Sequence, residues 1–373
     1  MKKISISVSI ILILLSIGCN SRDYEIIKNN KPKYGVKKAE IKDIYKIDEF
    51  LTANTSNCLG LYDNHIYYMS YLPSKNMYML NFIDMNGNIK NKIPVEIGKG
   101  PGEIVHTGGI KIDNEKIYIL DLKLRRLTYF TIEGMLIDTL DLKDTGLILN
   151  FDINDNVLSF YSRNKYFLGR YNIEKNKIIS SIQRKTTPKD GDRYKGGTVK
   201  IDDDTNKLYY GHLSIPYSID SLNENLKTNR RINIDYDSFD RVIWRIKDKN
   251  HKSMYGDFMI NSMDITDNYI YAPVMTKSKL FKGKNSKLKK VNGKITVFNK
   301  KTGNLWYIIE NEYLKDLNGM YSMIGVNKDY IVLYIFSRKG SKIYNKLVET
   351  KDKSYIRAIV VLKNPINYKE TKL

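Results

Sequence analysis

The 373-residue sequence is poor in the residues that build catalytic and metal centres. It contains two cysteines, and its four histidines are His65, His106, His212 and His251. No histidine pair has the H-E-x-x-H spacing of a zinc site, and no G-x-S-x-G segment supplies a hydrolase nucleophile. Two cysteines cannot form the disulfide framework of a small secreted domain. These absences weigh against a zinc enzyme, a serine hydrolase and a disulfide scaffold, and the sequence implies no cofactor.

Calcium loops are absent in complete form as well. Residues 84–88 (D-M-N-G-N) and 202–204 (D-D-D) resemble fragments of such loops. Neither run has the bidentate glutamate that closes an EF-hand loop at its twelfth position. Asp, Asn and Gly also favour tight turns. We therefore interpret both runs as turns and predict no metal site.

The chain lacks an apolar run of the about 20 residues that span a bilayer. Its N-terminal apolar stretch, residues 4–17, follows two lysines and is interrupted by serines, which is typical of a secretory signal. The stretch ends in L-S-I-G-C, where Gly18 directly precedes Cys19 as in lipoprotein cleavage sites, although Ser16 stands where leucine is usual. We predict a signal peptide over residues 1–18, lipidation of Cys19 and a polar tether over residues 19–38. Ordinary signal cleavage near that point is the alternative.

Acidic residues are outnumbered: 41 Asp and Glu stand against 62 Lys and Arg, giving a net charge of +21. In a cytosolic protein this balance would suggest nucleic acid. An exported protein instead meets lipid headgroups, lipopolysaccharide and acidic glycans, so we predict no nucleic-acid partner. The alternative is that heavy use of Lys, Asn, Ile and Tyr reflects an AT-rich genome.

Residues 277–294 form the most basic segment, with eight lysines and no acid. It is either a docking hairpin for an anionic headgroup or glycan, or a hairpin tip kept soluble by its charge. Its lysines are Lys277, Lys279, Lys282, Lys284, Lys287, Lys289, Lys290 and Lys294.

Alternating strands separated by Asp, Asn and Gly turns fill most of the chain. Six units each contain a strand, an Asp/Asn turn and then a hydrophobic pair, and the pairs recur at the spacing of propeller blades. The pairs are Ile66-Tyr67, Ile117-Tyr118, Val157-Leu158, Leu208-Tyr209, Ile270-Tyr271 and Ile331-Val332. This rhythm predicts an all-β propeller.

A glycine-rich bend formed by Gly98, Gly100, Pro101, Gly102 and Glu103 precedes the second unit. A phosphate loop would need G-K-[ST] before a helix, but here Glu103 follows the last glycine and a strand pattern comes next. We interpret the bend as a structural connector. Its backbone N–H groups can donate hydrogen bonds to the Glu103 carboxylate.

The segment G-K-G-P-G-E, followed by I-K-I-D-N-E-K-I-Y-I-L-D, resembles the six-bladed β-propeller lipoproteins of Bacteroidetes-type bacteria, relatives of the NHL, YWTD and TolB-like propellers. The strong resemblance covers residues 97–142, and the other units match in rhythm. It implies a closed propeller on a lipid anchor and carries over no catalytic residues.

We therefore expect a single six-bladed propeller over residues 39–373, closed by a strand in residues 41–50 that pairs beside residues 356–362. A seven-bladed ring that uses residues 41–50 and the long insertion is the alternative. Residues 236–257 are expected to form a short helix or a lid. Cys58, in an apolar context, is expected to be a small buried residue.

The function expected is that of a binding or scaffold protein for a protein or glycan partner, anchored at the cell envelope. We expect an outer-membrane location, facing the periplasm or the exterior. The alternative is a channel-mouth hydrolase or lyase acting on a carbohydrate or lactone. A propeller enzyme draws its carboxylates from several blades, so a single sequence does not show them.

Overall fold

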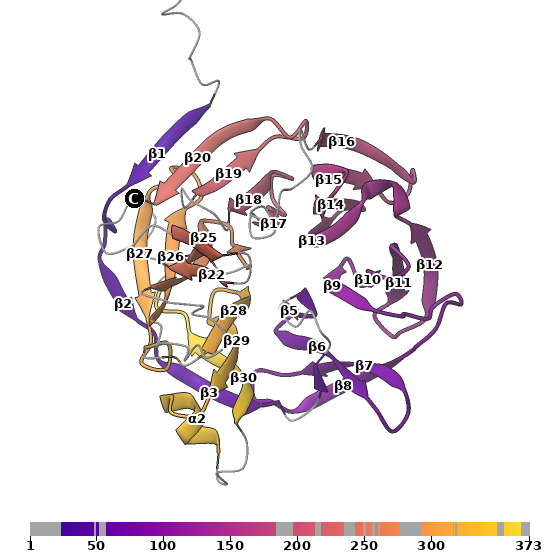
Figure 1. Cartoon of the computed structure of the whole chain (residues 1–373), viewed down its shortest axis with the longest axis horizontal. Helices are drawn as coiled ribbons and strands as arrows, with labels where there is room; N and C mark the ends of the chain where they lie inside the picture. The colour runs from indigo at the N-terminus through magenta and orange to yellow at the C-terminus, as the bar shows by residue number, and fades with distance from the viewer. Residues whose placement is uncertain are drawn as a thin grey trace, which may run out of the picture.

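The computed structural model describes residues 24–47, 50–51, 57–183, 197–212, 218–234, 243–248, 251–255, 258–259, 262–276, 292–315, 317, 319–348 and 354–366. Nearly all regular structure in them is β, and α2 (Lys342–Leu347) and the 3-10 turn η2 (Lys143–Thr145) are short exceptions. Figure 1 shows the strands arranged as blades around a central axis. No helix in these ranges is long and apolar enough to cross a membrane.

The first three blades are antiparallel sheets built from consecutive strands. Blade 1 contains β4 (Phe50–Leu51), β5 (Leu59–Tyr62), β6 (His65–Leu72), β7 (Met77–Ile83) and β8 (Ile89–Glu96). Blade 2 contains β9 (Thr107–Asp113), β10 (Lys116–Asp121), β11 (Arg126–Thr131) and β12 (Leu136–Asp141). Blade 3 contains β13 (Leu147–Asn154), β14 (Val157–Arg163), β15 (Tyr166–Asn172) and β16 (Lys177–Gln183).

The last three blades each include a strand from the N-terminal part of the chain. Blade 4 contains β17 (Gly197–Ile201), β18 (Leu208–His212), β19 (Ser218–Leu222), β20 (Thr228–Ile234) and β1 (Glu25–Asn29). Blade 5 contains β23 (Phe258–Met259), β24 (Asp264–Ile265), β25 (Tyr269–Thr276), β26 (Asn292–Asn299), β27 (Leu305–Glu310) and β2 (Val36–Lys38). Blade 6 contains β28 (Gly319–Val326), β29 (Tyr330–Arg338), β30 (Tyr355–Lys363) and β3 (Ile41–Lys46).

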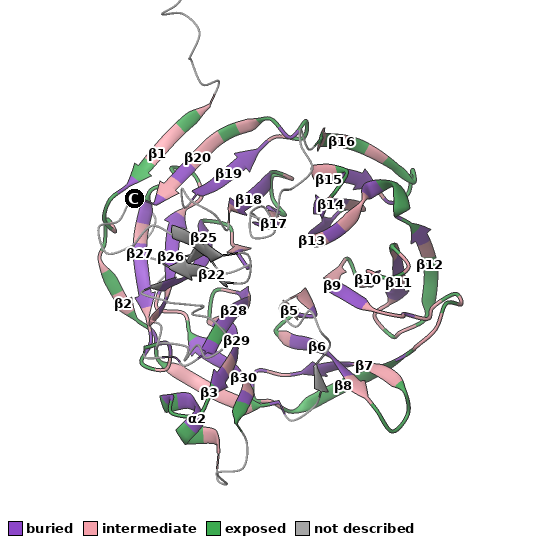
Figure 2. Cartoon of the chain, in the orientation of Figure 1, coloured by how far each residue is buried: buried purple, intermediate pink, exposed green. Residues whose placement is uncertain are grey.

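The buried apolar side chains form six clusters, and each cluster lies between two neighbouring blades. One cluster joins Leu80 of blade 1 to Ile119 of blade 2, and the last joins Val361 of blade 6 to Ile66 of blade 1. The other four fill the interfaces from blade 2 round to blade 6. Figure 2 shows this burial on the inner and middle strands of the blades. The described chain is therefore a closed six-bladed ring, and the predicted fold class is confirmed in place of the seven-bladed alternative.

Each of the six hydrophobic pairs in the sequence lies on the second strand of its blade: β6, β10, β14, β18, β25 or β29. The second strand has neighbours on both sides within its own sheet, and both of its faces touch other blades. Strands in such positions read as continuous apolar runs rather than as a clean alternation. This explains why the pairs were the strongest repeated signal.

Strand β3 closes the ring as expected. It pairs antiparallel with β30 over Ile41 to Lys46, so the outer strand of the last blade comes from the start of the chain. Tyr45 of this strand also reaches blade 1. Its hydroxyl donates a hydrogen bond to the Met85 carbonyl at 2.5 Å, and its ring lies under Gly87, where a Cβ would meet Tyr45 Cδ1 at 2.4 Å.

Residues 25–38 differ from the tether that the sequence suggested, because the structure places two strands there. β1 pairs parallel with β20, and β2 pairs parallel with β27, so residues 25–46 run around the outside of three blades in succession. We call residues 25–46 the N-terminal belt. Both strands are short and paired along one edge only, and neither has the alternating apolar pattern that identifies a strand.

The insertion at residues 236–257 was predicted to form a short helix or a lid; its described part contains no helix and no additional blade, and the lid stays a prediction. β21 (Ile243–Asp248) pairs with β22 (His251–Tyr255) as a two-stranded antiparallel sheet. The run I-W-R-I is rich in strand-forming residues, and this preference outweighed the helix expected from the charged residues around it. Cys58 is buried, as expected.

The Tyr45 contact predicts how much ring closure depends on one side chain. Replacing Tyr45 by Phe removes one hydrogen bond and should lower the free energy of unfolding by about 1 kcal/mol. Tyr45→Ala also leaves a void beside Gly87 and should cost about 2 to 3 kcal/mol. Urea unfolding measures both changes. Met135→Ala, at a side chain 65% exposed, is the control and should change stability by less than about 0.5 kcal/mol. Equal effects of Tyr45→Ala and the control would refute the role of Tyr45 in closure.

Candidate functional site: the mouth of the central channel

The innermost strands of the six blades surround the central channel. In ring order they are β5, β9, β13, β17, β24 and β28, and each contacts the next. At the same position on four successive strands stands a charged residue flanked by apolar ones: Lys111, Asp152, Lys200 and Asp264. Successive side chains of a strand point to opposite faces of its sheet. The flanking apolar side chains therefore lie on one face, in a blade interface, and the charged side chain lies on the other, toward the channel. The sign of the charge alternates from blade 2 to blade 5.

These four side chains form a continuous chain of ion pairs, which we call the charge layer. Lys111 Nζ lies 3.2 Å from Asp152 Oδ1. Lys200 Nζ lies 3.5 Å from Asp152 Oδ2 and 3.2 Å from Asp264 Oδ1. Each carboxylate also accepts a backbone hydrogen bond from the following blade, Asp152 from Ile201 N at 2.9 Å and Asp264 from Val326 N at 2.7 Å. The charge layer therefore ties five blades together around the channel.

The side chains of the charge layer keep one another ionised. Burial alone would raise the pKa of Asp152, but the ammonium groups of Lys111 and Lys200 hold it below its usual value. Burial would likewise lower the pKa of Lys200, but Asp152 and Asp264 hold it well above the usual range. Both partners are thus ionised at neutral pH. The carboxylate of Asp152 is almost fully buried, whereas the lysines keep part of their side chains exposed to the channel.

A layer of amide and hydroxyl groups lies next to the charge layer along the channel. Asn150 donates through Nδ2 to Asn57 Oδ1 at 3.1 Å, and its Oδ1 accepts from Val199 N at 2.8 Å. Ser262 Oγ accepts from Met323 N at 3.0 Å. The channel here narrows to a cavity of about 40 Å³. This layer closes the channel to anything much larger than water.

On the other side of the charge layer the channel opens into a cavity of about 670 Å³, which we call the mouth. Its walls include Tyr62, Tyr67, Asp113, Asn114 and Asp203, and Lys111 and Lys200 lie among its lining residues. The lining comes from the first strands of the blades and the turns that follow them. The mouth is therefore a polar, charged pocket of the size that encloses a small organic ligand.

The carboxylates at the rim of the mouth are protonated more easily than usual. Burial, together with the nearby carboxylates of Asp155 and Asp203, raises the pKa of Asp113 to about 6. Burial also raises the pKa of Asp203, against the opposing effect of Lys200. Asp113 is therefore half-ionised about one pH unit below neutrality. Among the described residues, no group of three or more His, Cys, Asp or Glu side chains is placed to hold a metal ion.

The glycine-rich loop lies outside this site. It joins β8 to β9 and reaches β9 at Thr107, at the opposite end of the strand from Asp113. The Gly100 N–H donates to Glu103 Oε2 at 2.5 Å, and a Cβ on Gly98 would lie 2.1 Å from that same oxygen. The loop thus binds its own carboxylate.

Arg126 fixes the other side of this loop. Its guanidinium donates to the carbonyls of Lys99 at 3.0 Å and Gly100 at 2.8 Å, and also to the carbonyl of Glu103. These contacts join the loop to β11 of blade 2. The loop is a connector between blades, and these polar groups are hydrogen-bonded within the loop or to Arg126.

The other candidate residues are dispersed. Cys19 and seven lysines of the basic segment lie outside the described residues, and Lys294 on β26 pairs with Glu310 at 3.1 Å. His212, at the end of β18, has its Nε2 2.9 Å from Oδ2 of Asp220 on β19, and it is not among the residues that line the mouth. Its place beside Asp220 gives it a structural contact.

The two calcium-like runs are turns. Asp84 accepts from the backbone N–H groups of Asn86 and Asn88 at 2.8 and 3.0 Å. In the second run Asp202 and Asp204 both pair with Lys300, at 2.8 and 3.0 Å, while Asp203 lines the mouth. The carboxylates of Asp84, Asp202 and Asp204 are thus engaged by groups of the chain itself.

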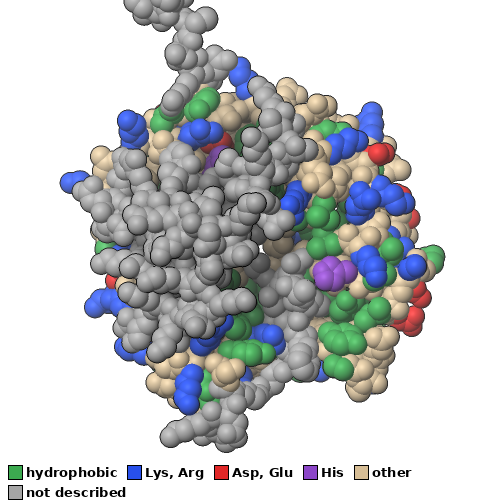
Figure 3. All heavy atoms as spheres, in the orientation of Figure 1, with side chains coloured by type: hydrophobic (Ala, Val, Ile, Leu, Met, Phe, Trp, Pro, Cys, Tyr) green, Lys and Arg blue, Asp and Glu red, His purple; other side chains and the backbone are tan. Residues whose placement is uncertain are grey.

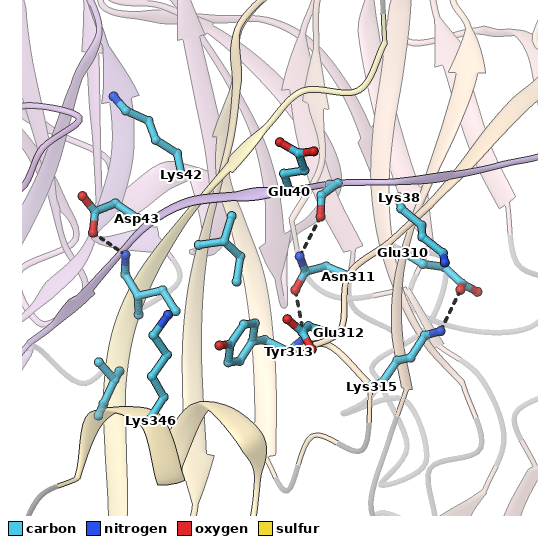
Figure 4. A pocket seen from close by; sticks show the side chains of 14 residues that line it. Lys38, Glu40, Lys42, Asp43, Glu310, Asn311, Glu312, Tyr313, Lys315 and Lys346 are labelled. Atoms are coloured by element: carbon cyan, nitrogen blue, oxygen red, sulfur yellow. Dashed lines mark hydrogen bonds and ion pairs between the residues drawn. The ribbon is translucent and has the colours of Figure 1, made fainter.

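A second cavity of about 680 Å³ lies on the outside of the ring, where the belt crosses from blade 5 to blade 6. Figure 4 shows charged side chains of both signs around it. Asn311 Nδ2 donates to the Ala39 carbonyl at 2.8 Å, and Lys315 Nζ pairs with Glu310 Oε2 at 3.3 Å. Its polar groups fasten the belt to blade 5, so we favour the mouth as the functional site.

Sequence reasoning did not find the charge layer, although it left a signal. Four units begin with a charged residue between two apolar ones: I-K-I at 110–112, F-D-I at 151–153, V-K-I at 199–201 and M-D-I at 263–265. A charge in the strand nearest a core needs a partner. The opposite signs of successive units were the clue that the strands meet.

The charge layer predicts a large effect of one neutral substitution. Asp152→Asn leaves Lys111 and Lys200 without their shared carboxylate and should lower the free energy of unfolding by about 3 kcal/mol. The matched control is Asp141→Asn, which breaks an exposed pair with Lys143 (2.5 Å) and should cost less than about 1 kcal/mol. Urea unfolding of both variants tests the difference. Similar losses in the free energy of unfolding for the two variants would contradict a stabilising role of the buried ion pairs.

The raised pKa of Asp113 predicts that the Asp113→Asn variant is more stable than the parent protein at neutral pH but not at acidic pH. Because the folded state binds its proton more tightly than the unfolded state does, native stability falls as pH rises from about 4 to about 6. Asp113→Asn should remove this loss. After a discount for partial solvent exposure, the variant should be more stable than the parent by about 1 kcal/mol near pH 7 and equal to it near pH 4. Thermal unfolding at both pH values measures this, and a gain at both would refute it.

Solved structures support the fold assignment. A member of the DUF4221 family from Bacteroides vulgatus has a TM-score of 0.59 at 12% identity, and the match covers 88% of this chain and 98% of that one. A protein from Bacteroides fragilis that is named as an exported protein has a TM-score of 0.54 at 12% identity, with 91% and 99% covered. At this identity the similarity is one of fold. No curated protein matches the chain.

A sequence family described as a 6-bladed beta-propeller matches residues 46–333. This range takes in blades 1 to 3, blades 4 and 5 apart from their belt strands β1 and β2, and part of blade 6. The number of blades agrees with the six clusters of the core. The chain belongs to the DUF5128 family of 6-bladed beta-propellers.

Proposed function

We propose that the protein is an exported, lipid-anchored binding protein of the cell envelope whose channel mouth binds the end of a glycan. The observation that carries this proposal is the mouth itself. A cavity of about 670 Å³ is floored by the lysines of the charge layer and rimmed by Asp113 and Asp203. Ammonium groups that donate hydrogen bonds and carboxylates that accept them converge there from four different blades.

A hydroxyl-rich ligand fits this chemistry. Sugar hydroxyls donate to carboxylates and accept from ammonium groups, so one ring can satisfy both kinds of side chain at the mouth. Tyr62, which is only partly buried, adds aromatic surface against which the apolar face of a sugar can pack. The cavity beside the amide layer has room for little more than water, so a glycan would enter the mouth by its end rather than pass through the channel.

Location follows from the N-terminal sequence. The secretory signal, Gly18 and Cys19 support export and lipid anchoring, and an outer-membrane location is part of this proposal. The amino-terminal end of the described chain lies at the rim of blade 4, so an anchor there leaves the mouth unobstructed by the first strand. Envelope glycans are the ligands such a protein meets. No step of the proposal requires a cofactor.

A second candidate function is supported by Asp113. A carboxyl group with a pKa of about 6 can donate or accept a proton near neutral pH, as general acid–base catalysis requires. The alternative is therefore a hydrolase or lyase that acts on a carbohydrate or lactone at the mouth. It would use Asp113 for proton transfer and Lys111 and Lys200 to stabilise negative charge.

The test begins with an array of neutral and acidic oligosaccharides and continues with calorimetry on those retained. Lys111→Met and Asp113→Asn should each weaken binding by about tenfold or more. Lys92→Met and Asp138→Asn, which change exposed residues on the outer strands β8 and β12, are the matched controls and should leave binding unchanged. Failure of every oligosaccharide to bind, or equal binding by all variants, would overturn the proposal. Turnover that Asp113→Asn abolishes while binding persists would favour the enzyme.

A further inference from the structure

The N-terminal belt carries a basic and aromatic surface on the outer perimeter of blade 5. Tyr34 and Val36 are 45% and 51% exposed, although both are large apolar side chains. We define the belt patch as Lys31, Lys33, Tyr34, Val36, Lys37 and Trp306. Figure 1 places β2 and β27 of this patch at the outer edge of the ring, on the side opposite β12.

The aromatic side chains of the patch form one packed group with lysines over it. The rings of Tyr34 and Trp306 meet edge to face with centroids 5.0 Å apart, and Tyr34 lies 5.4 Å from Tyr307. Lys33 Nζ lies 4.9 Å from the Tyr34 centroid and 5.8 Å from that of Trp306. Lys37 Nζ lies 5.5 Å from the Tyr307 centroid. Cations and amphipathic rings are therefore presented together on one surface.

The backbone holds this group in place on the blade. The N–H groups of Lys33 and Tyr34 donate to the carbonyls of Leu305 and Trp306 at 2.8 and 2.9 Å. Ile308 N donates to the Gly35 carbonyl at 3.2 Å, and β2 then continues in parallel pairing with β27. The patch is thus preorganised, so its side chains need little further ordering when they bind.

Charge adds to this arrangement. Residues 25–38 contain five lysines and one acid, a net charge of +4, and that acid, Glu25, already pairs with Arg230 at 2.7 Å. In Figure 3 blue side chains are seen both along the left perimeter, where β1 and β2 lie in Figure 1, and along the right, whereas red ones are seen mainly along the right. The left perimeter therefore has fewer acidic side chains to offset its lysines in this view.

We propose that the belt patch rests on the headgroup layer of an anionic bilayer, so that the propeller stands edge-on to the membrane. Tyrosine and tryptophan favour the boundary between headgroups and water, and each lysine near an anionic surface adds about 1 kcal/mol. Closeness to the bilayer rests on the lipidation of Cys19 proposed above. Five residue steps separate Cys19 from Tyr24, a reach of at most about 18 Å. The described chain begins at the rim of blade 4, next to blade 5 on which the patch lies.

Edge-on seating has a geometric result. The central channel runs along the axis of the ring, whereas the patch lies on the circumference of the ring. With the patch on the bilayer, the mouth opens parallel to the membrane plane. A glycan that projects from a neighbouring envelope molecule would then approach the mouth from the side.

The test places a fluorescent label at two matched positions of the lipid-anchored chain. Val36→Cys on β2 and Ile137→Cys on β12 replace exposed apolar residues, 51% and 42% exposed, on opposite edges of the ring. Cys58 is only 1% exposed, and acylation occupies the Cys19 thiol, so each variant offers one reactive thiol. Each labelled protein is reconstituted in vesicles of phosphatidylethanolamine and phosphatidylglycerol that contain a spin-labelled quencher lipid.

We expect quenching at position 36 to exceed that at position 137 several-fold. Adding Lys31→Glu and Lys33→Glu should reduce the quenching at position 36, while flotation with the vesicles stays unchanged because the anchor is intact. Equal quenching at the two positions in a protein that floats would overturn the proposal.

A separate arm covers failure of the anchor. If mass spectrometry finds Cys19 unmodified, the Cys19→Ser chain labelled at position 36 is mixed with the same vesicles. Quenching that appears with phosphatidylglycerol, and is lost in phosphatidylcholine vesicles or at high salt, would support the patch without the anchor. Absence of quenching in both lipids would overturn it. Retention of quenching in phosphatidylcholine would refute the electrostatic part of the argument.

Discussion

Closure of the ring is the constraint on which the rest of this structure depends. A four-stranded blade has two apolar faces and can bury them only against other blades. The six clusters of buried side chains lie in the six interfaces, so each blade relies on both of its neighbours. The last interface exists because β3, from the start of the chain, completes blade 6 and places Tyr45 against blade 1.

The charge layer shows how a channel lined by polar groups remains compatible with this ring. Each buried charge has an opposite charge on the next blade and, for the two carboxylates, a backbone N–H beyond it. The same side chains therefore hold the inner strands together and form the floor of the mouth. A ligand that binds there meets groups whose positions are already set by the fold, which limits the cost of ordering them.

The sequence predicted the fold well because its signals are local. The Asp and Asn turns and the apolar pairs such as Ile117-Tyr118 lie within a few residues of one another, and ring closure by residues 41–50 followed from the missing outer strand. The belt strands β1 and β2 were not predicted, because their partners lie some 200 residues or more away in sequence and their own composition is polar.

The candidate site was beyond sequence reasoning for a related reason. Lys111, Asp152, Lys200 and Asp264 each come from a different blade, and only the register of the innermost strands brings them together. Sequence did supply the individual clues, a charge between two apolar residues in four successive units. The glycine-rich loop had the most conspicuous composition in the chain, but its polar groups bind one another and lie at the end of β9 away from the mouth.

The N-terminal belt also fixes an order of events in the life of the chain. Glu25 pairs beside Arg230, and Val36 pairs beside Ile308, so the segment made first finds its partners only after most of the polypeptide exists. Contacts this distant in sequence form late, because a long loop must close before they stabilise anything. Most of the chain therefore leaves the ribosome before the belt strands β1 and β2 have a surface to join. Folding of this propeller ends where its synthesis began.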